Sequence, residues 1–536
     1  MAQTRFNLEE GPYPHFQTET PSSPPRALLF WVGLTLAILV SRLANINVLW
    51  TDEDYHLAAA IQLLHGKALY RDLWYDKPPL NAWLFLLFGA WPGWPMRVFG
   101  TLLAVLSCVF AYRFGAGIWS RREGYAAAAL MGFFQVFYFQ ASTIPMEPDT
   151  LMLAPHLATI YLAWRGRYLG SGVAAGIAFL MNPKAAFVVI SALAFLPLGS
   201  VRALAVAALS FGGAFVVVNG IALAFLVSQG AAQDFFLQVW KWGLMYAGSP
   251  PVDMGAFSPL QKLGHWLGFH ALLVIGAARL WLARTESGAL RLQFAFWTLI
   301  SLAAAAVGFR FAPHYLNQLL PPLVICAARG WTLLIPSKGA EPLSPMHISH
   351  PESSPADASP PRPAGWAKWV AIAALAAGVV VPVVRFSPHY AELIADDLQG
   401  RRHTWEDVHM DQDARRAADI INAAAQPDDT IFIWGYRPNI IDYTRLPAVG
   451  KFWESQPVTG VPADRHLSSS QSLDADLAKR NLQELVRSRP NIIVDGLSLY
   501  NQDLSMQSRV ETRNWLLSYC EIGNTGQGIL IYQRCR

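Results

Sequence analysis

The segment ALLFWVGLTLAILVSRLA (27–44) and the acidic run WTDEDY (50–55) that follows it decide how this chain folds. An apolar segment of about 20 residues is long enough to cross a bilayer as a helix. Charged side chains are costly near hydrocarbon, and those present there commonly serve an ion, a substrate or a reaction. The sequence therefore predicts a membrane helix that ends beside a functional site containing Asp52, Glu53 and Asp54.

The composition of the 536-residue chain also indicates a polytopic α-helical membrane protein. Hydrophobic residues make up 53% of the chain and charged residues only 15%, whereas soluble domains contain about 25% charged residues. The net charge of +4 is small, and no basic run with interleaved aromatic residues is present, so we expect no nucleic-acid partner. The sequence contains no P-loop or dinucleotide fingerprint, which disfavours a nucleotide-sugar donor.

Apolar segments predict about eleven transmembrane helices. They lie at 27–44, 96–119, 125–142, 151–164, 169–181, 186–198, 204–227, 263–282, 292–307, 316–335 and 366–384. Arginines gather in alternate short loops, as at Arg121, Arg122, Arg165 and Arg167, and such loops are cytoplasmic by the positive-inside rule. This orientation predicts a multi-pass protein of the cell inner (plasma) membrane, with its N-terminus in the cytoplasm and its C-terminus outside.

The segments outside the predicted spans differ in composition. Residues 1–26 indicate a disordered cytoplasmic tail, and residues 337–365 a Pro/Ser-rich cytoplasmic linker. The transmembrane catalytic domain would cover 27–336, with a long first outer loop at 46–95 that holds short interfacial helices at 55–64 and 80–88. After the last span (366–384), residues 385–536 predict a small extracytoplasmic α/β domain with helices at 414–425 and 474–488 and strands at 430–434, 491–494 and 528–532.

Two cysteines flank a hairpin-like stretch near the end of the chain, Cys520 and Cys535. A disulfide between them is expected if this end of the protein lies outside the cytoplasm. Two free thiols remain the alternative.

The first outer loop contains two groups of residues suited to chemistry. Asp52 could act as a general base on an acceptor hydroxyl, although a helix N-cap is the simpler role for one such acid. In WYDKPPL (74–80), the Pro pair stiffens the chain beside Lys77, which could meet a phosphate as a point charge. Asp76 could hold a divalent cation or pair with Lys77.

Further candidates lie in the later outer loops. PMEPDT (145–150) supplies Glu147 and Asp149, and LMNPK (180–184) supplies Lys184, a phosphate ligand or a side chain that snorkels to the interface. GFRFAPHY (308–315) offers the hydrogen-bond donors of three side chains, Arg310, His314 and Tyr315. Trp240 in WKW (240–242) could stack on a sugar ring or anchor the interface.

Together these motifs resemble the GT-C superfamily of integral-membrane glycosyltransferases, in particular the bacterial protein O-mannosyltransferase and aminoarabinose (lipid A) transferase families. The resemblance rests on the acids after the first helix, the Asp-Lys-Pro motif, the Glu-Pro of the next outer loop and the Pro-His-Tyr before LLPP (319–322). The outer-domain stretch DTIFIWGYRP (429–438) is also similar to that of such enzymes.

The resemblance implies an inverting transfer of a sugar from a polyprenyl-phosphate-linked donor to a hydroxyl of a cell-envelope acceptor, at the outer face of the lipid bilayer. By position it implies catalytic roles for Asp52 and Glu147, contacts of Lys77, Lys184 and Arg310 with the donor phosphate, and a metal contact for Asp76 if a divalent ion is used. The side chains expected around the substrates are Glu53, Tyr55, Asp149, Trp240, His314 and Tyr315.

Two other functions fit a membrane protein with polar outer loops. A transporter or flippase of a lipid-linked glycan would place charges near the midplane and would show repeated halves. A non-catalytic scaffold would leave the acids and the Lys-Pro-Pro motif without a purpose. The polar residues of this chain gather at the predicted outer helix ends, which favours the transferase.

Overall fold

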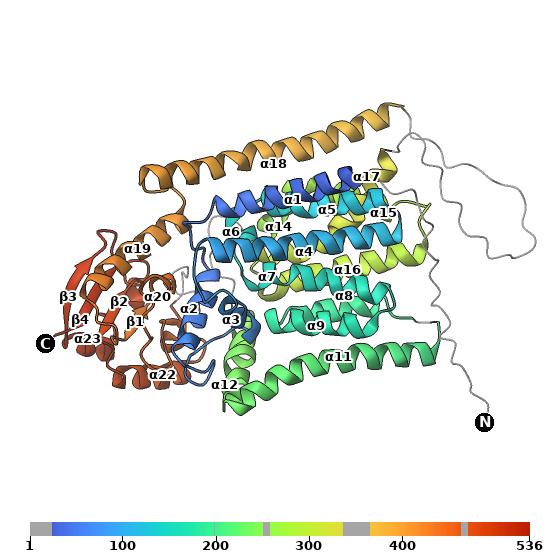
Figure 1. Ribbon diagram of the computed structural model, residues 1–536. Coiled ribbons are helices and arrows are strands. Elements are labelled where there is room, and N and C mark those ends of the chain that lie inside the picture. The colour runs from blue at the N-terminus through green and yellow to red at the C-terminus, as the bar shows by residue number, and fades with distance from the viewer. Residues whose placement is uncertain (1–23, 198, 250–257, 336–364, 463–469, 536) are drawn as a thin grey trace, which may run out of the picture.

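The computed structural model describes residues 24–197, 199–249, 258–335, 365–462 and 470–535, and these are mostly helical. The opening apolar segment forms α1 (Pro24–Leu43). Figure 1 shows the long helices side by side in one bundle, with α18 (Gly365–Gln399) along one side and α11 (Val201–Ser228) along the other. Of the predicted cytoplasmic tail and linker, only residues 24–26 and 365 fall in the described ranges, and these four residues are helical.

The other helices of the bundle follow the predicted apolar segments closely. They are α4 (Trp94–Ile118), α5 (Arg121–Val136), α8 (Leu153–Trp164), α9 (Tyr168–Met181), α10 (Ala185–Leu193), α14 (Pro259–Phe269), α15 (Ala271–Trp281), α16 (Gly288–Ala306) and α17 (Leu320–Leu334). Within the described ranges, five helices are long and apolar enough to cross a membrane, or six if the bent pair α14–α15 counts as one span. The larger count of about eleven stays a prediction.

Three predicted spans differ from the observed helices. The span 263–282 is broken, because α14 and α15 meet at a bend of 80°. The span 125–142 ends early with α5, and a separate short helix, α6 (Gln140–Thr143), follows. The last span does not stop at residue 384: α18 continues to Gln399 through two internal prolines. Hydropathy records how apolar a segment is and does not record where its backbone bends.

The first outer loop packs at one end of the bundle, where it forms α2 (Glu53–Leu64) and α3 (Pro79–Leu86). The prediction that 55–64 lies along the membrane surface is wrong for α2, because its residues from Glu53 to Gln62 are all buried. Gln62 explains part of this burial, since its side chain bonds to the backbones of Leu446 and Ala448 in the C-terminal domain, at 3.1 and 2.7 Å. This helix therefore lies inside the protein, between the bundle and the domain.

The residues after α18 contain a four-stranded sheet in the order β1-β2-β4-β3. Strands β1 (Ile431–Trp434) and β2 (Ile492–Asp495) are parallel and completely buried, as parallel strands usually are. Strands β4 (Leu530–Arg534) and β3 (Tyr519–Asn524) continue the sheet in antiparallel fashion. The helices around it are α19 (Glu406–Ala424), α20 (Asn439–Thr444), α21 (Gln456–Thr459), α22 (Ala475–Arg487) and α23 (Val510–Leu516).

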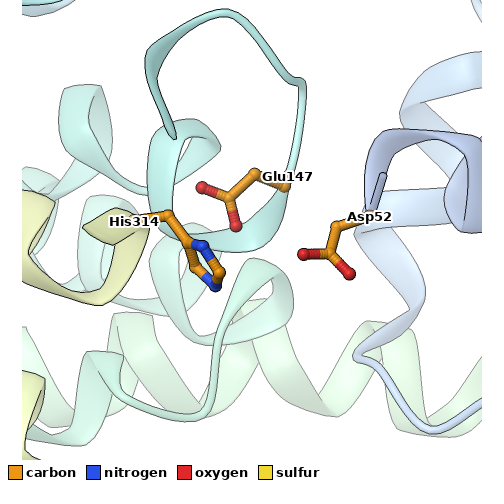
Figure 2. Close-up of side chains that lie close together, drawn as sticks. All are labelled: Asp52, Glu147 and His314. Carbon is orange, nitrogen blue, oxygen red and sulfur yellow. The ribbon is translucent and has the colours of Figure 1, made fainter. Parts of the chain in front are cut away.

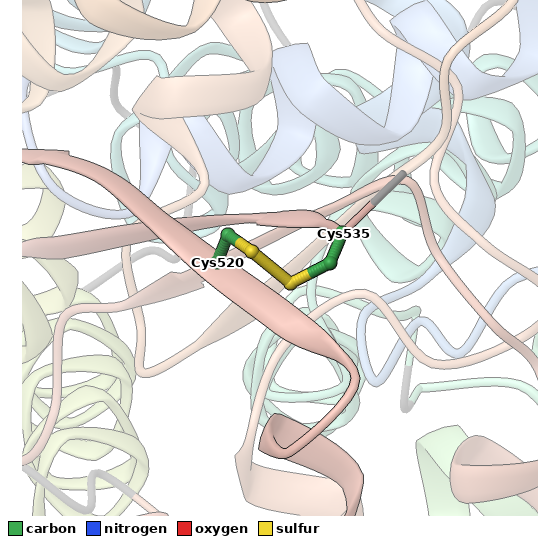
Figure 3. The surroundings of a disulfide bond; sticks show 2 residues. All are labelled: Cys520 and Cys535. Atoms are coloured by element: carbon green, nitrogen blue, oxygen red, sulfur yellow. A yellow bond between two sulfur atoms is a disulfide. The ribbon is translucent and has the colours of Figure 1, made fainter.

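A disulfide joins Cys520 of β3 to Cys535, which directly follows β4 (Figure 3). It closes the antiparallel hairpin at the edge of the sheet. Of the two alternatives that the sequence left open for these cysteines, the structure contains the bonded pair.

Backbone bonds hold the C-terminal domain against the first outer loop. The amide of Trp74 donates to the carbonyl of Lys451 at 2.8 Å, and the indole of Trp453 donates to the carbonyl of Trp74 at 2.7 Å. The ammonium group of Lys67 donates to the carbonyls of Ala448 and Gly450 at 2.5 and 2.6 Å. The loop and the domain therefore form one continuous packed unit at this end of the bundle.

A buried ion pair fixes the start of α2 to the bundle. Glu53 is 0% exposed, and its carboxylate accepts two bonds from the guanidinium of Arg97 in α4, at 2.6 and 2.9 Å. The same carboxylate accepts from the amides of Trp50, at 2.9 Å, and Met146, at 3.0 Å. Glu53 thereby joins three separate segments: the chain between α1 and α2 at Trp50, α4, and the loop that precedes α7 (Pro148–Leu151).

Replacing Arg97 with Gln should destabilise the protein strongly, because the buried Glu53 would lose its counter-ion. The expected loss is about 3–5 kcal/mol of unfolding free energy, measured as a fall in the Tm of the purified protein. Arg71→Gln is the matched control, since the pair Arg71–Asp72 is exposed and exposed ion pairs contribute little to stability. Equal Tm values for the two variants would contradict this account of Glu53.

Candidate active site

Asp52 sits directly before α2, and its backbone is strained. Its φ is +77°, in a region that residues other than glycine seldom occupy. Glu53, the next residue, is held by the ion pair with Arg97, so the turn before it is fixed. Strained backbone of this kind is frequent at active sites, where the surrounding structure holds it in place.

Asp52, Glu147 and His314 meet at one point although they are far apart in the sequence. One ligand atom from each lies within 4.8 Å of the others. Figure 2 shows the three side chains converging from different segments: the start of α2, the residue before α7, and the 3₁₀ helix Pro313–Leu319. The structure thus brings together the two predicted catalytic acids and a predicted substrate-binding histidine.

The buried carboxyl group of Glu147 lacks a full set of hydrogen-bond partners among the described residues. It is 2% exposed, and its Oε1 atom has no hydrogen-bond partner among the described residues. Burial raises the pKa of Glu147 well above its usual range, and the nearby carboxylates Asp149 and Asp52 raise it further. A buried carboxyl group with a free oxygen needs a proton, a cation or a hydrogen-bond donor of a substrate to satisfy that oxygen.

Two lysines add positive charge around these acids. The ammonium group of Lys77 lies 3.1 Å from each carboxylate oxygen of Asp76. Burial alone would lower the pKa of Lys77, but attraction to Asp76 and Asp52 outweighs it and raises that pKa. Lys184 lies 3.3 Å from Asp149 and 3.2 Å from the ring centre of Tyr315, and burial lowers its pKa.

Several predicted substrate-binding residues instead support their neighbours. The predicted role of Glu53 does not fit its saturated, fully buried carboxylate. Asp149 is also occupied, since it accepts bonds from Asn182, Lys184 and Gln318 at 3.1, 3.3 and 3.0 Å. Both acids position the groups that face the site and are not free to bind a substrate.

Asp76 does not belong to the group that could hold a metal ion. Both of its oxygens face Lys77, and the cluster that the described residues offer at this place is Asp52, Glu147 and His314. Two carboxylates and an imidazole are a suitable donor set for a divalent cation such as Mn²⁺ or Zn²⁺. The free oxygen of Glu147 fits such an ion, so these three residues could hold one, and a metal contact of Asp76 stays a prediction.

The remaining predicted residues lie around the site in different ways. Arg310 is 4% exposed, and one nitrogen donates to the carbonyl of Tyr246 at 3.1 Å and to the hydroxyl of Ser249 at 2.6 Å. Its Nε and Nη1 atoms have no partner among the described residues, so it keeps donors for a ligand. Trp240 packs against Phe179 of α9, at 5.4 Å between ring centres, and no described contact links it to the acids.

An aromatic stack joins the site to the C-terminal domain. Tyr55 is 2% exposed and stacks on Tyr75, Tyr436 and Trp453, with ring centres 5.3, 5.6 and 4.9 Å apart. Its ring is enclosed by other rings, so we assign Tyr55 to the wall of the site in place of the predicted contact with a substrate.

Sequence reasoning missed Tyr436, which comes from the C-terminal domain. Its hydroxyl donates to Oδ1 of Asp52 at 3.3 Å. The residue follows strand β1 and Gly435, whose φ of +126° allows a sharp turn there. A tyrosine at a glycine turn directly after a buried strand was a usable signal, because such turns often present functional side chains.

Part of the sequence matches a known family, and the fold is similar to that of solved structures. A family model described as dolichyl-phosphate-mannose-protein mannosyltransferase matches residues 76–227. The structure of ArnT from Cupriavidus metallidurans in the apo state has a TM-score of 0.59 at 14% identity, covering 95% of this chain and 98% of that one. ArnT bound to undecaprenyl phosphate gives a TM-score of 0.56 with the same identity and coverage.

A third similar structure is the oligosaccharyltransferase of Archaeoglobus fulgidus in its apo form. Its TM-score is 0.51 at 12% identity, covering 92% of this chain and 72% of that chain. No curated protein sequence matches the chain. The matched stretch and the shared fold confirm the resemblance to GT-C membrane glycosyltransferases that was drawn from the sequence motifs.

Proposed function

We propose that this protein transfers a sugar from a polyprenyl-phosphate-linked donor to a hydroxyl of a cell-envelope acceptor. The observation that carries the proposal is the meeting of Asp52, Glu147 and His314 beside two partly buried lysines at one end of the helix bundle. The structure of ArnT in complex with undecaprenyl phosphate supports a lipid-phosphate donor for a chain of this fold.

The orientation in the membrane follows from the basic loops. Arg121 and Arg122 begin α5, and Arg165 and Arg167 lie between α8 and α9. In Figure 1 these helix ends lie at the end of the bundle opposite to α2 and the C-terminal domain. If the basic end faces the cytoplasm, the site and the domain face outward from the inner membrane, where the bond between Cys520 and Cys535 would be stable.

The proposed reaction is a single displacement at the anomeric carbon. The hydroxyl of the acceptor gives its proton to the carboxylate of Asp52, and its oxygen attacks the anomeric carbon from the face opposite the phosphate. The bond between the sugar and the phosphate oxygen breaks, and the lipid phosphate leaves with the electron pair. One displacement inverts the anomeric configuration.

Positive groups would stabilise the leaving phosphate. Lys77 and Lys184 each form an ion pair with an aspartate in the site, and two nitrogens of Arg310 have no partner among the described residues. Preorganised donors of this kind stabilise charge as it develops, with little reorganisation. A divalent cation held by Asp52, Glu147 and His314 would add a further positive charge for the donor phosphate.

A transporter of lipid-linked glycans fits the structure less well. The ionisable side chains discussed above lie at one end of the bundle, among α2, α7 and the 3₁₀ helix before α17. A transport pathway would instead need polar groups near the middle of the spans.

Asp52→Asn should abolish transfer and leave the protein folded, because it removes the acceptor of the proton and keeps the shape of the side chain. The expected result in a deletion strain is accumulation of one lipid-linked sugar and loss of one envelope glycan, detected by mass spectrometry. The wild-type gene should restore the glycan and the Asp52→Asn gene should not. Restoration by an Asp52→Asn protein of normal Tm would refute the assignment.

Glu147→Gln and His314→Gln test the proposed ion. If the three residues hold a divalent cation, wild-type activity should fall after chelation and return with added Mn²⁺ or Zn²⁺. Each variant should need at least about tenfold more metal, because one ligand of three is weakened. Asp76→Asn should keep the wild-type metal requirement. Wild-type activity that is unchanged by exhaustive chelation would exclude the ion. The proposed transferase activity would then still be tested by Asp52→Asn.

Tyr436→Phe should lower kcat about tenfold with little change in Tm, since it removes one hydrogen bond to a charged acceptor and keeps the aromatic stack. Tyr443→Phe is the matched control: it removes a bond of 2.6 Å to Asp411 in the same domain, and this bond does not involve Asp52. The control should lower Tm with little effect on kcat. The opposite pattern would show that Tyr436 has only a structural role.

A further inference from the structure

A π-helix lies at the end of the bundle where α11 meets the first outer loop. It covers Phe236–Lys241, between α12 (Ala232–Phe235) and α13 (Trp242–Gly248), and α12 marks its place in Figure 1. π-Helical turns are rare in proteins and often lie at functional sites. Gln238 lies in this turn and is 0% exposed. A buried amide needs partners for both its oxygen and its nitrogen, so the hydrogen bonds of Gln238 show what the turn holds.

Both polar atoms of the Gln238 side chain bind the backbone of the first outer loop. The Oε1 atom accepts from the amide of Tyr75 at 2.7 Å, and the Nε2 atom donates to the carbonyl of Tyr70 at 2.8 Å. An amide side chain can make this pair of bonds because it has an acceptor and a donor side by side. Gln238 thus joins the two ends of the segment 70–75, which lies just before Lys77.

The backbone that Gln238 holds also fixes the backbone of Lys77. The hydroxyl of Tyr70 donates to the carbonyl of Lys77 at 2.8 Å, so Tyr70 is bonded to Gln238 at one end and to Lys77 at the other. Tyr70 has a φ of +69°, a strained conformation that persists only where the surroundings hold it. Pro78 restricts the preceding residue, Lys77, to extended backbone conformations. The ammonium group of Lys77 therefore starts from a backbone that Gln238 helps to fix.

The same helical segment also holds Arg310. In α13, the carbonyl of Tyr246 accepts from Nη2 of Arg310 at 3.1 Å, and the guanidinium carbon lies 3.9 Å from the centre of the Tyr246 ring. Ser249, directly after α13, accepts from the same nitrogen at 2.6 Å. Lys77 and Arg310 come from distant parts of the chain, and one continuous helical segment is bonded to both the loop of Lys77 and the side chain of Arg310.

We propose that Gln238 is a positioning residue for binding of the donor phosphate, because its amide holds the loop from which Lys77 reaches that phosphate. This inference rests on the transfer proposed above. Gln238 acts through Lys77 and does not itself bind the donor, since both of its polar atoms are bonded to the loop backbone. The helical segment that contains it keeps Lys77 and Arg310 in place around one phosphate. Groups fixed in advance stabilise charge with little reorganisation.

The experiment measures binding of undecaprenyl phosphate to the full chain, purified in detergent, from the rise in Tm during titration. Gln238→Met removes both hydrogen bonds and keeps a side chain of similar size. Lys77→Gln removes the cation itself. Gln62→Met is the matched control, because Gln62 is also 0% exposed and also bonds to two backbone groups, those of Leu446 and Ala448.

Gln238→Met should weaken binding of undecaprenyl phosphate at least about tenfold, because the ammonium group of Lys77 is no longer held in place. In a chain that already carries Lys77→Gln, the same change should weaken binding little further, since both substitutions act on one contact. Gln62→Met should lower the Tm of the free protein and leave its affinity for the probe unchanged.

Gln238→Glu gives a second measurement that a side chain with a purely space-filling role would not alter. A protonated glutamic acid can accept from Tyr75 and donate to Tyr70 as the amide does, whereas the ionised form can only accept. The affinity of Gln238→Glu, relative to the wild type at the same pH, should therefore fall as the pH rises. This dependence should disappear in the Lys77→Gln background, and Gln238→Met should not show it.

The outcomes separate this inference from the proposed function. Failure of the wild type to bind undecaprenyl phosphate, or equal binding by Lys77→Gln, would remove the donor-phosphate role of Lys77 and the inference with it. Weaker binding by Lys77→Gln together with wild-type affinity of Gln238→Met would overturn the inference alone. An equal effect of Gln238→Met with and without Lys77, or of Gln62→Met, would also overturn it. If Gln238→Met does not fold, the pH dependence of Gln238→Glu decides.

Discussion

The buried pair of Arg97 and Glu53 is the constraint on which the site depends. The four hydrogen bonds of Glu53 join the chain at Trp50, α4 and the loop before α7, and so hold Asp52 and Glu147, from different loops, in one place. A charged pair with almost no exposure survives only when its hydrogen bonds are complete. The carboxylate of Glu53 is saturated by these partners, and it fixes the position of its neighbour Asp52.

The C-terminal domain also helps to hold the residues around Asp52 in place. Its backbone bonds with the first outer loop, and the rings of Tyr436 and Trp453 enclose Tyr55 beside Asp52. If Asp52 is the base proposed above, its carboxylate is set correctly only when the domain that carries Tyr436 is docked. The C-terminal domain is then a component of the site.

The sequence predicted the helical bundle well, because long apolar segments allow few other structures. It also predicted that Asp52, Glu147 and His314 would share one face, since charge asymmetry placed their loops together. It could not show that Glu53 and Asp149 are saturated, because their partners Arg97 and Gln318 are 44 and 169 residues away. It missed the burial of α2, because that burial follows from contacts with the C-terminal domain far along the chain. It also missed β3, although this strand pairs with its neighbour β4.

Because the backbone of Asp52 is left-handed, stability and the proposed function favour different residues at this position. At a φ of +77°, glycine or asparagine would fit with less strain. Either residue would be expected to make the fold more stable while removing the carboxylate. If Asp52 is the proposed base, selection for thermostability alone would therefore favour inactive proteins at this position, and the strained aspartate is a place where stability is given up for function.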